Sequence, residues 1–213
     1  MSVVYKEYSN FLSPVQCKDL ISFFTDPKRA EQGKTVLKRA EVDDNQNGGS
    51  KADPSRTADV LFFARDGIIA NKYGLVNVCK PINSGDFGNH ARYSLKNIEG
   101  WQFIRYEVGG EYIPHYDFDP DLKNANNKTR LAYNGGLRLK SIIIYLNDDF
   151  EGGETAFTKI NLKIKPETGK LLIWENVHAD RKLNLDTLHA GLPVTKGTKY
   201  VLITWLREGI WGL

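Results

Sequence analysis

Cysteine is almost absent from this chain, which has two, Cys17 and Cys79, among 213 residues. That number is too small for a disulfide framework, and we expect both to be small apolar side chains. Long apolar runs are also missing: no stretch approaches the roughly 18 residues of a membrane-spanning helix, so we expect no membrane partner. The N-terminal residues lack the apolar core of a signal peptide, and we expect a cytoplasmic protein unless a targeting segment has been removed.

Charge of one sign is not concentrated either. The net charge is +3 and the pI is about 8.7, but Lys and Arg are scattered, with modest clusters at residues 163–170 and 181–182. Nucleic-acid-binding proteins usually carry a basic stripe, so we expect no nucleic-acid partner and solvated side chains in both clusters. A hydrophobic content of 41% in 213 residues is typical of a single globular domain, residues 1–213, with a sizeable core.

The N-terminal part carries a clear helix signal. Ser13 followed by Pro14 is typical of a helix start, because serine caps the first turn and proline is favoured at the first helical position. Apolar residues then recur at helical spacing and predict a helix over residues 13–25, at Cys17, Leu20, Ile21 and Phe24. Further on we expect, in order, a flexible polar loop, a strand and a second helix at residues 43–55, 56–63 and 67–73.

From Trp101 onward the pattern becomes that of a β-domain, with short apolar or aromatic segments separated by turns. Gly109-Gly110 predicts a hairpin-like break, and the polar, Asn-rich residues 119–136 predict a mobile loop. Short strands of this kind favour a sandwich or a jelly roll, and no internal repeat or second domain boundary is visible. The expected strands are residues 101–106, 112–118, 139–146, 170–174 and 200–206.

Two histidines and an aspartate form the most informative pattern. His115 and Asp117 lie two residues apart in an expected strand, so both side chains point to one face, about 6–7 Å apart. With His189, 74 residues after His115, they make the two-imidazole, one-carboxylate set that holds non-haem Fe(II) and leaves positions open. Lys199, ten residues later, places a cation where a dicarboxylate co-substrate would need one.

These residues also allow other interpretations. His178 and Asp180 form a second pair, but only His189 follows them, nine residues past Asp180, which leaves little chain for crossing a barrel. Each histidine alone is also compatible with an ordinary core or surface position. Zinc accepts the same donors, but the HExxH helix is absent and no obvious general-base glutamate accompanies the set.

The surrounding blocks extend this pattern. Residues 105–118 read RYEVGGEYIPHYDF, residues 152–157 read GGETAF, and residues 188–194 read LHAGLPV, with Lys199 behind them. In this order and spacing the blocks resemble the prolyl 4-hydroxylases, a family of Fe(II)/2-oxoglutarate dioxygenases. The resemblance is close over roughly residues 100–208 and weak before that, where FLSP at 11–14 and Arg56-Thr57 match.

The resemblance implies an α+β fold with a double-stranded β-helix (jelly-roll) core. The core is expected at residues 100–213, supported by N-terminal helices in a helical and mixed part at residues 1–99. The implied Fe(II) ligands are His115, Asp117 and His189. Lys199, Tyr106 and Thr155 are implied to hold 2-oxoglutarate, although an exposed lysine, a core aromatic and a strand–turn residue are the ordinary alternatives. In the family, a peptide groove is lined by residues at positions that correspond to Tyr112, Arg138, Trp205 and Arg207. These four side chains are equally compatible with an ordinary core or solvated location.

The implied activity is hydroxylation of prolyl residues at C4 in a peptide or protein. It is coupled to oxidative decarboxylation of 2-oxoglutarate to succinate and CO₂, uses O₂, and is expected to take L-ascorbate as reductant. The resemblance does not give the oligomeric state or the substrate motif. The loops at residues 43–55 and 119–136 are expected to close over the peptide. The alternatives are another Fe(II)/2-oxoglutarate oxygenase, acting on a free amino acid, a lysyl residue or a nucleobase, and a non-catalytic binding module of the same fold.

Overall fold

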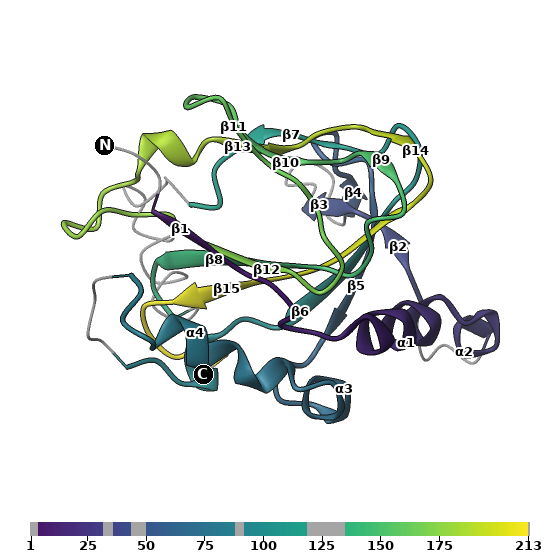
Figure 1. Ribbon diagram of the computed structural model, residues 1–213, viewed down its shortest axis with the longest axis horizontal. Helices are drawn as coiled ribbons and strands as arrows, with labels where there is room; N and C mark the ends of the chain where they lie inside the picture. The colour runs from purple at the N-terminus through teal and green to yellow at the C-terminus, as the bar shows by residue number, and fades with distance from the viewer. Residues whose placement is uncertain (1–3, 32–35, 44–49, 88–91, 119–134, 213) are drawn as a thin grey trace.

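The computed structural model describes residues 4–31, 36–43, 50–87, 92–118 and 135–212. Two antiparallel sheets face each other, and helices cover the outer side of the larger one (Figure 1). This is the double-stranded β-helix core, with supporting helices, that the sequence predicts. Among the described residues, none of the helices combines the length and the apolar composition needed to cross a lipid bilayer.

The larger sheet has seven strands and the smaller has four. In spatial order the larger sheet contains β1 (Tyr5–Tyr8), β12 (Leu171–Glu175), β8 (Arg138–Tyr145), β15 (Lys199–Arg207), β6 (Trp101–Tyr106), β5 (Asp59–Phe63) and β2 (Lys38–Arg39). The smaller sheet contains β11 (Leu162–Ile164), β10 (Thr155–Phe157), β13 (His189–Gly191) and β7 (Tyr112–His115). Two further strand pairs are β9 (Glu151–Gly152) with β14 (Val194–Lys196), and β3 (Glu41–Asp43) with β4 (Ser50–Ala52).

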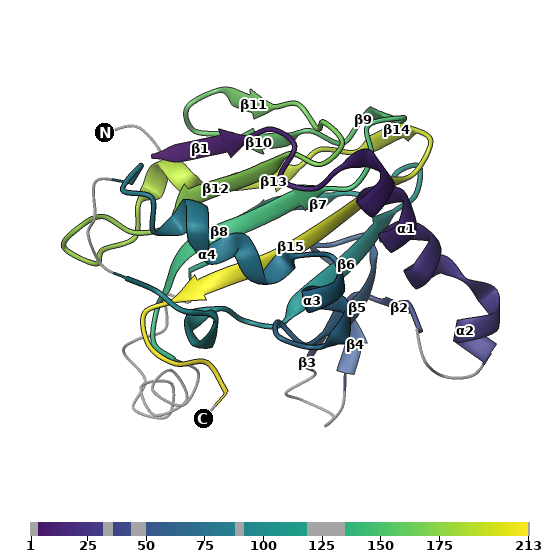
Figure 2. The same cartoon turned by 60° about the horizontal axis from the view of Figure 1, so that its bottom comes forward.

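The helices lie against the larger sheet on the side away from the smaller one (Figure 2). They are α1 (Pro14–Thr25), α3 (Ile68–Lys72), α4 (Cys79–Ile82) and the 3₁₀ turns η1 (Leu75–Val78) and η2 (Leu95–Asn97). The short helix α2 (Pro27–Glu31) follows α1, and the turn η3 (Leu185–Thr187) lies directly before β13 of the smaller sheet. The predicted helix at residues 13–25 is confirmed as α1. Its capping box is formed, because Ser13 Oγ accepts from Gln16 N at 3.2 Å and Gln16 Oε1 accepts from Ser13 N at 2.9 Å.

The second half of strand β8, residues 142–145, is wholly apolar because it is buried on both faces. Successive side chains of a strand point to opposite faces, so alternate residues enter two different cores. Ile142 and Ile144 pack with the helices, whereas Ile143 and Tyr145 face the smaller sheet. A central strand buried on both faces needs such a continuous apolar run, and this second core forms the floor on which the candidate site is built.

The structure corrects three expectations from the sequence. Gly109-Gly110 does not close a hairpin, because β6 pairs with β5 and β15 in the larger sheet and β7 pairs with β13 in the smaller one. The glycines instead carry the chain between sheets, and a Cβ on Gly110 would lie 2.9 Å from the carbonyl oxygen of Thr57. Lys170 is not solvated but is 4% exposed, with hydrogen bonds to Glu7 and to a backbone carbonyl.

The third correction concerns the polar segment at residues 43–55. Its described ends are paired strands, with Asp43 opposite Ser50, rather than open loop. The intervening residues 44–49, and residues 119–134 of the second predicted loop, lie outside the described part of the chain. The expected strand at 56–63 begins at Asp59, and Arg56 forms an isolated bridge to Tyr112.

Candidate metal centre

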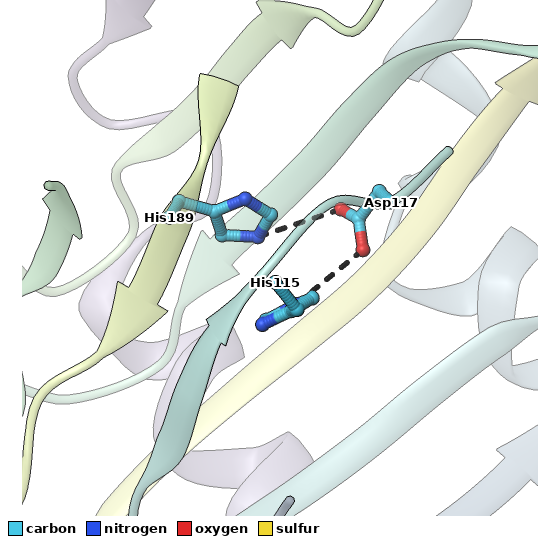
Figure 3. A group of neighbouring side chains, drawn as sticks. All are labelled: His115, Asp117 and His189. Atoms are coloured by element: carbon cyan, nitrogen blue, oxygen red, sulfur yellow. Dashed lines mark ion pairs between the residues drawn. The ribbon is translucent and has the colours of Figure 1, made fainter. Parts of the chain in front are cut away.

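His115, Asp117 and His189 converge between the two sheets (Figure 3). His189 opens β13 directly opposite His115, the last residue of β7, and Asp117 follows two residues later. His115 Nε2 lies 3.6 Å from Asp117 Oδ1, and His189 Nε2 lies 3.6 Å from Asp117 Oδ2. The three donor atoms lie within 4.8 Å of one another, a spacing that one ion with bonds of about 2.0–2.2 Å can span.

Backbone carbonyls orient both imidazoles. His115 Nδ1 lies 2.8 Å from the carbonyl oxygen of Ile113, and His189 Nδ1 lies 3.0 Å from that of Thr187. A carbonyl oxygen can only accept, so each Nδ1 carries a proton and each ring turns its Nε2 toward Asp117. Metal-binding histidines usually have such a partner on the second nitrogen.

The charge states also suit a metal. Burial lowers the pKa of His189 to about 4, although the Asp117 charge opposes the shift, so the ring is neutral at physiological pH. Burial would raise the pKa of Asp117, but the imidazoles of His189 and His115 and the Arg138 charge outweigh it and hold that pKa below its usual range. A neutral imidazole and an ionised carboxylate are the forms that bind a cation.

A pocket of about 480 Å³, including its mouth, opens beside the three donors. It is lined by five further residues singled out from the sequence, Tyr106, Thr155, Lys199, Tyr112 and Trp205. Thr155 Oγ1 is hydrogen-bonded to Tyr145 Oη at 2.7 Å, which fixes the threonine hydroxyl at the pocket wall. Tyr145 was not singled out from the sequence, since a tyrosine in an apolar strand gives no signal of this contact.

Lys199 is a buried cation with few partners. Its side chain is 5% exposed, its Nζ donates to the carbonyl oxygen of Gly153 at 2.7 Å, and it lies 5.1 Å from the Tyr106 ring centre. No carboxylate of the described residues forms an ion pair with it. Burial lowers the pKa of Lys199 to about 8, while the charge of Glu154 opposes the shift. Burying a cation against neutral acceptors is costly, and an anionic ligand would relieve that cost.

Gly153 makes room for this lysine. The residue has a φ of +68°, and a Cβ there would lie 3.1 Å from Lys199 Cδ and 2.9 Å from the Phe150 ring. Both the left-handed backbone and the close approach require glycine. The Gly-Gly-Glu-Thr block therefore places the lysine and Thr155 at the same end of the pocket.

The predicted groove residues separate into two groups. Tyr112 stacks on His115 with ring centres 3.5 Å apart, and Trp205 lies under the Arg138 guanidinium at 3.7 Å. Arg138 and Arg207 do not line the pocket, because both bind the buried carboxylate of Glu99, at 2.7 and 2.6 Å. Their role in substrate binding stays a prediction.

Two pocket residues were missed as site residues. Arg56 lines the pocket and lies over the Tyr112 ring at 5.1 Å, and its only sequence signal was the Arg56-Thr57 block. Trp174 is 1% exposed and meets the His189 ring edge-on at 4.8 Å. Across the described ranges no other group of three metal-binding side chains forms, so His178 joins no such centre.

Comparisons with known proteins agree with this geometry. The chain is 29% identical to "Probable prolyl 4-hydroxylase 3" of Arabidopsis thaliana, over 95% of this chain and 68% of that protein. It is 30% identical to "Probable prolyl 4-hydroxylase 10" of the same plant, over 94% of this chain and 67% of that protein. It superposes with a TM-score of 0.66, at 26% identity and 94% coverage of both chains, on the viral collagen prolyl hydroxylase vCPH of Paramecium Bursaria Chlorella virus-1, solved with 2OG.

The sequence profile of the 2OG-Fe(II) oxygenase superfamily matches residues 101–207 of this chain, from the start of β6 to the end of β15. That span contains the three donor residues, Thr155 and Lys199, and leaves out the N-terminal helices. The protein is thus a member of the 2OG-Fe(II) oxygenase superfamily and, within it, of the prolyl 4-hydroxylase family.

Proposed function

We propose that the protein hydroxylates prolyl residues of a peptide or protein at C4, as an Fe(II)- and 2-oxoglutarate-dependent dioxygenase. The observation that carries the proposal is a buried cation, Lys199, which has no ion-pair partner among the described residues and lies in the same pocket as a two-histidine, one-carboxylate donor set. Such a pocket suits a ligand that chelates a metal at one end and presents a carboxylate at the other. 2-Oxoglutarate has that shape, and the names of the relatives support a prolyl substrate.

The donor set fits Fe(II). His115 Nε2, His189 Nε2 and the Asp117 carboxylate would hold the ion and leave coordination positions open for the co-substrates. Bound Fe(II), with 2-oxoglutarate and O₂, supplies the oxidising chemistry, in which 2-oxoglutarate becomes succinate and CO₂ and one oxygen atom enters the C–H bond. L-ascorbate is proposed as the reductant on the family resemblance alone.

The protein's own residues bind, orient and exclude water. Lys199 would pair with the distal carboxylate of 2-oxoglutarate, and the hydroxyl of Thr155 and the phenol of Tyr106 line the same pocket. The remainder of the pocket wall is largely apolar and keeps water from the reacting atoms, through Ile143, Trp174, Val201 and Ile203. At the pocket, the aromatic faces of Tyr112 and Trp205 provide surfaces on which a proline ring packs well.

The test is mass spectrometry of peptides incubated with the enzyme, Fe(II), ascorbate and 2-oxoglutarate. We expect a gain of one oxygen on proline, succinate released in equal amount, and no gain in matched peptides with alanine in place of proline. Lysyl peptides and free amino acids serve as competing substrates. Oxygen added to lysine, or succinate release that no peptide stimulates, would reject the prolyl substrate, and absence of any 2-oxoglutarate turnover would favour a binding module.

Binding of 2-oxoglutarate is expected to weaken as the pH rises through about 8. Only the charged ammonium attracts a carboxylate, and burial lowers the pKa of Lys199 to about 8, so the Kd should rise about tenfold per pH unit above that value and level off below it. Burial raises the pKa of Tyr106 to about 12, so its phenol stays protonated throughout. Calorimetric titration of the Mn(II)-loaded protein measures the Kd at each pH. A Lys199→Arg variant, charged at every pH, is expected to show no such slope; an equal slope in both proteins would contradict the assignment.

A further inference from the structure

Asp117 has a partner besides the two histidines. Ser141 Oγ lies 2.6 Å from Asp117 Oδ2, the carboxylate oxygen that faces His189 Nε2. The serine is in the middle of β8 and is fully buried, at 0% exposure. A hydroxyl donating to a carboxylate at this distance is a strong, charge-assisted hydrogen bond. It fixes the rotation of the carboxylate group and occupies one lone pair of Oδ2.

Asn176 in turn orients the serine. Its Nδ2 lies 2.9 Å from Ser141 Oγ and 3.3 Å from the carbonyl oxygen of Arg138, so its two amide protons have one acceptor each. The serine hydroxyl has a single proton and two nearby acceptors, Asp117 Oδ2 at 2.6 Å and Asn176 Oδ1 at 3.1 Å. The Asp117 oxygen is the closer of the two, and it carries the charge. The proton is therefore directed to Asp117, and the hydrogen bonds run in one direction from Asn176 through Ser141 to the carboxylate.

Both members of this relay are held by the paired strands β8 and β12. Asn176 follows β12 and is 1% exposed; its N–H donates to the carbonyl oxygen of Leu139 and its own carbonyl accepts from Asn184. One residue before it, Glu175 pairs with Lys140 at 2.5 Å, in register across β12 and β8. Groups fixed on paired strands hold a ligand more accurately than groups on loops.

We propose that Ser141 is a positioning residue for Asp117, and that Asn176 acts on the aspartate only through the serine. The inference rests on the proposed metal centre and adds to it a residue on a different strand that no spacing of the donors predicts. Loss of a hydrogen-bonding partner of a metal ligand typically lowers metal affinity 10–100-fold. The same loss is expected for Ser141→Ala.

The experiment is calorimetric titration of the full chain with Mn(II), a stand-in that needs no turnover and resists oxidation. Ser141→Ala should raise the Kd for Mn(II) about 10–100-fold, and Ser141→Thr, which keeps the hydroxyl, should remain within a few fold of the unchanged protein. The matched control is Thr204→Val. Thr204 is equally buried, and its replacement by valine also removes one hydroxyl hydrogen bond, to the carbonyl oxygen of Glu99 at 2.9 Å. Thr204 does not touch the donor set.

A double variant separates the two links of the relay. Asn176→Ala alone should weaken Mn(II) binding, and adding it to Ser141→Ala should weaken binding little further, because both remove the same interaction. Effects that multiply would overturn the role given to Asn176, and Ser141→Ala with unchanged affinity would overturn the role given to Ser141. If Ser141→Ala lowers the melting temperature, the rise in melting temperature that Mn(II) causes still reports the affinity. This rise should be smaller in Ser141→Ala than in Thr204→Val. An unchanged protein that binds no Mn(II) would instead overturn the metal centre itself, and the inference with it.

Discussion

Replacing His189 by alanine is expected to abolish Fe(II)-dependent turnover of 2-oxoglutarate. The imidazole supplies one of only three donors, and its Nε2 already lies 3.6 Å from Asp117 Oδ2 in the geometry that a shared ion requires. Losing a ligand should cost more than the 10–100-fold that follows loss of a residue supporting a ligand. Succinate release measures the turnover, and titration with Mn(II) measures the accompanying loss of metal affinity.

His178→Ala is the matched control for this variant. His178 belongs to the other histidine–aspartate pair of the sequence, but it lines a different cavity and is absent from the donor set. Turnover in His178→Ala should equal that of the unchanged protein. Full activity in His189→Ala would mean that His189 is not a ligand, and loss of activity in His178→Ala would mean that the wrong histidine–aspartate pair had been assigned to the metal.

Replacing Lys199 by methionine is expected to weaken 2-oxoglutarate binding about 10–100-fold without lowering stability. The variant keeps a long apolar stem but removes a charge-assisted hydrogen bond to the co-substrate, which is worth about 1.5–3 kcal/mol. At neutral pH, below the lowered pKa of Lys199, the buried ammonium is charged and costs free energy in the folded state. Relief of that cost offsets the lost hydrogen bond to Gly153, so the melting temperature should not fall.

This combination distinguishes a binding lysine from a structural one. The measurements are the KM for 2-oxoglutarate and the melting temperature without ligands, with Lys196→Met as control. Lys196 is exposed and pairs with Glu151 at 2.8 Å, so its replacement should change neither quantity by much. A Lys199→Met protein that melts far lower, with an unchanged KM, would show that the lysine supports the fold rather than the co-substrate.

The donor set could be predicted because it obeys local rules. His115 and Asp117 are two residues apart, a spacing that suits one face of a strand. The expected strand at residues 112–118 in fact ends at His115, yet Asp117, just beyond it, still joins the same donor set. His189 could be added only through the resemblance of its block, because nothing local says that β13 pairs with β7. Lys199 could be singled out as a candidate for a physical reason: a lysine at the start of an apolar strand must either reach solvent or meet an anion.

Contacts between distant strands could not be predicted. Ser141 and Asn176 are a small and a polar residue in apolar surroundings, and their link to Asp117 exists only once β8 and β12 are in register. The ion pairs of Arg138 and Arg207 with the buried carboxylate of Glu99 likewise depend on long-range pairing, because a buried charge requires paired partners. The hairpin predicted at Gly109-Gly110 was wrong because a hairpin is only the usual local outcome. The strands on either side, β6 and β7, pair instead with strands of two different sheets.

Because the two imidazoles meet through strand pairing, the length of chain that joins them does not matter to the metal centre. Residues can be inserted into or deleted from the connections between β7 and β13, away from the strands and from Asp117, Asn176 and Thr187, and both rings stay where they are. Removing one residue inside either strand would instead turn a ring to the opposite side of the sheet. Such an architecture can diversify its connections, and the partners they recognise, while two very short strands keep a constant length.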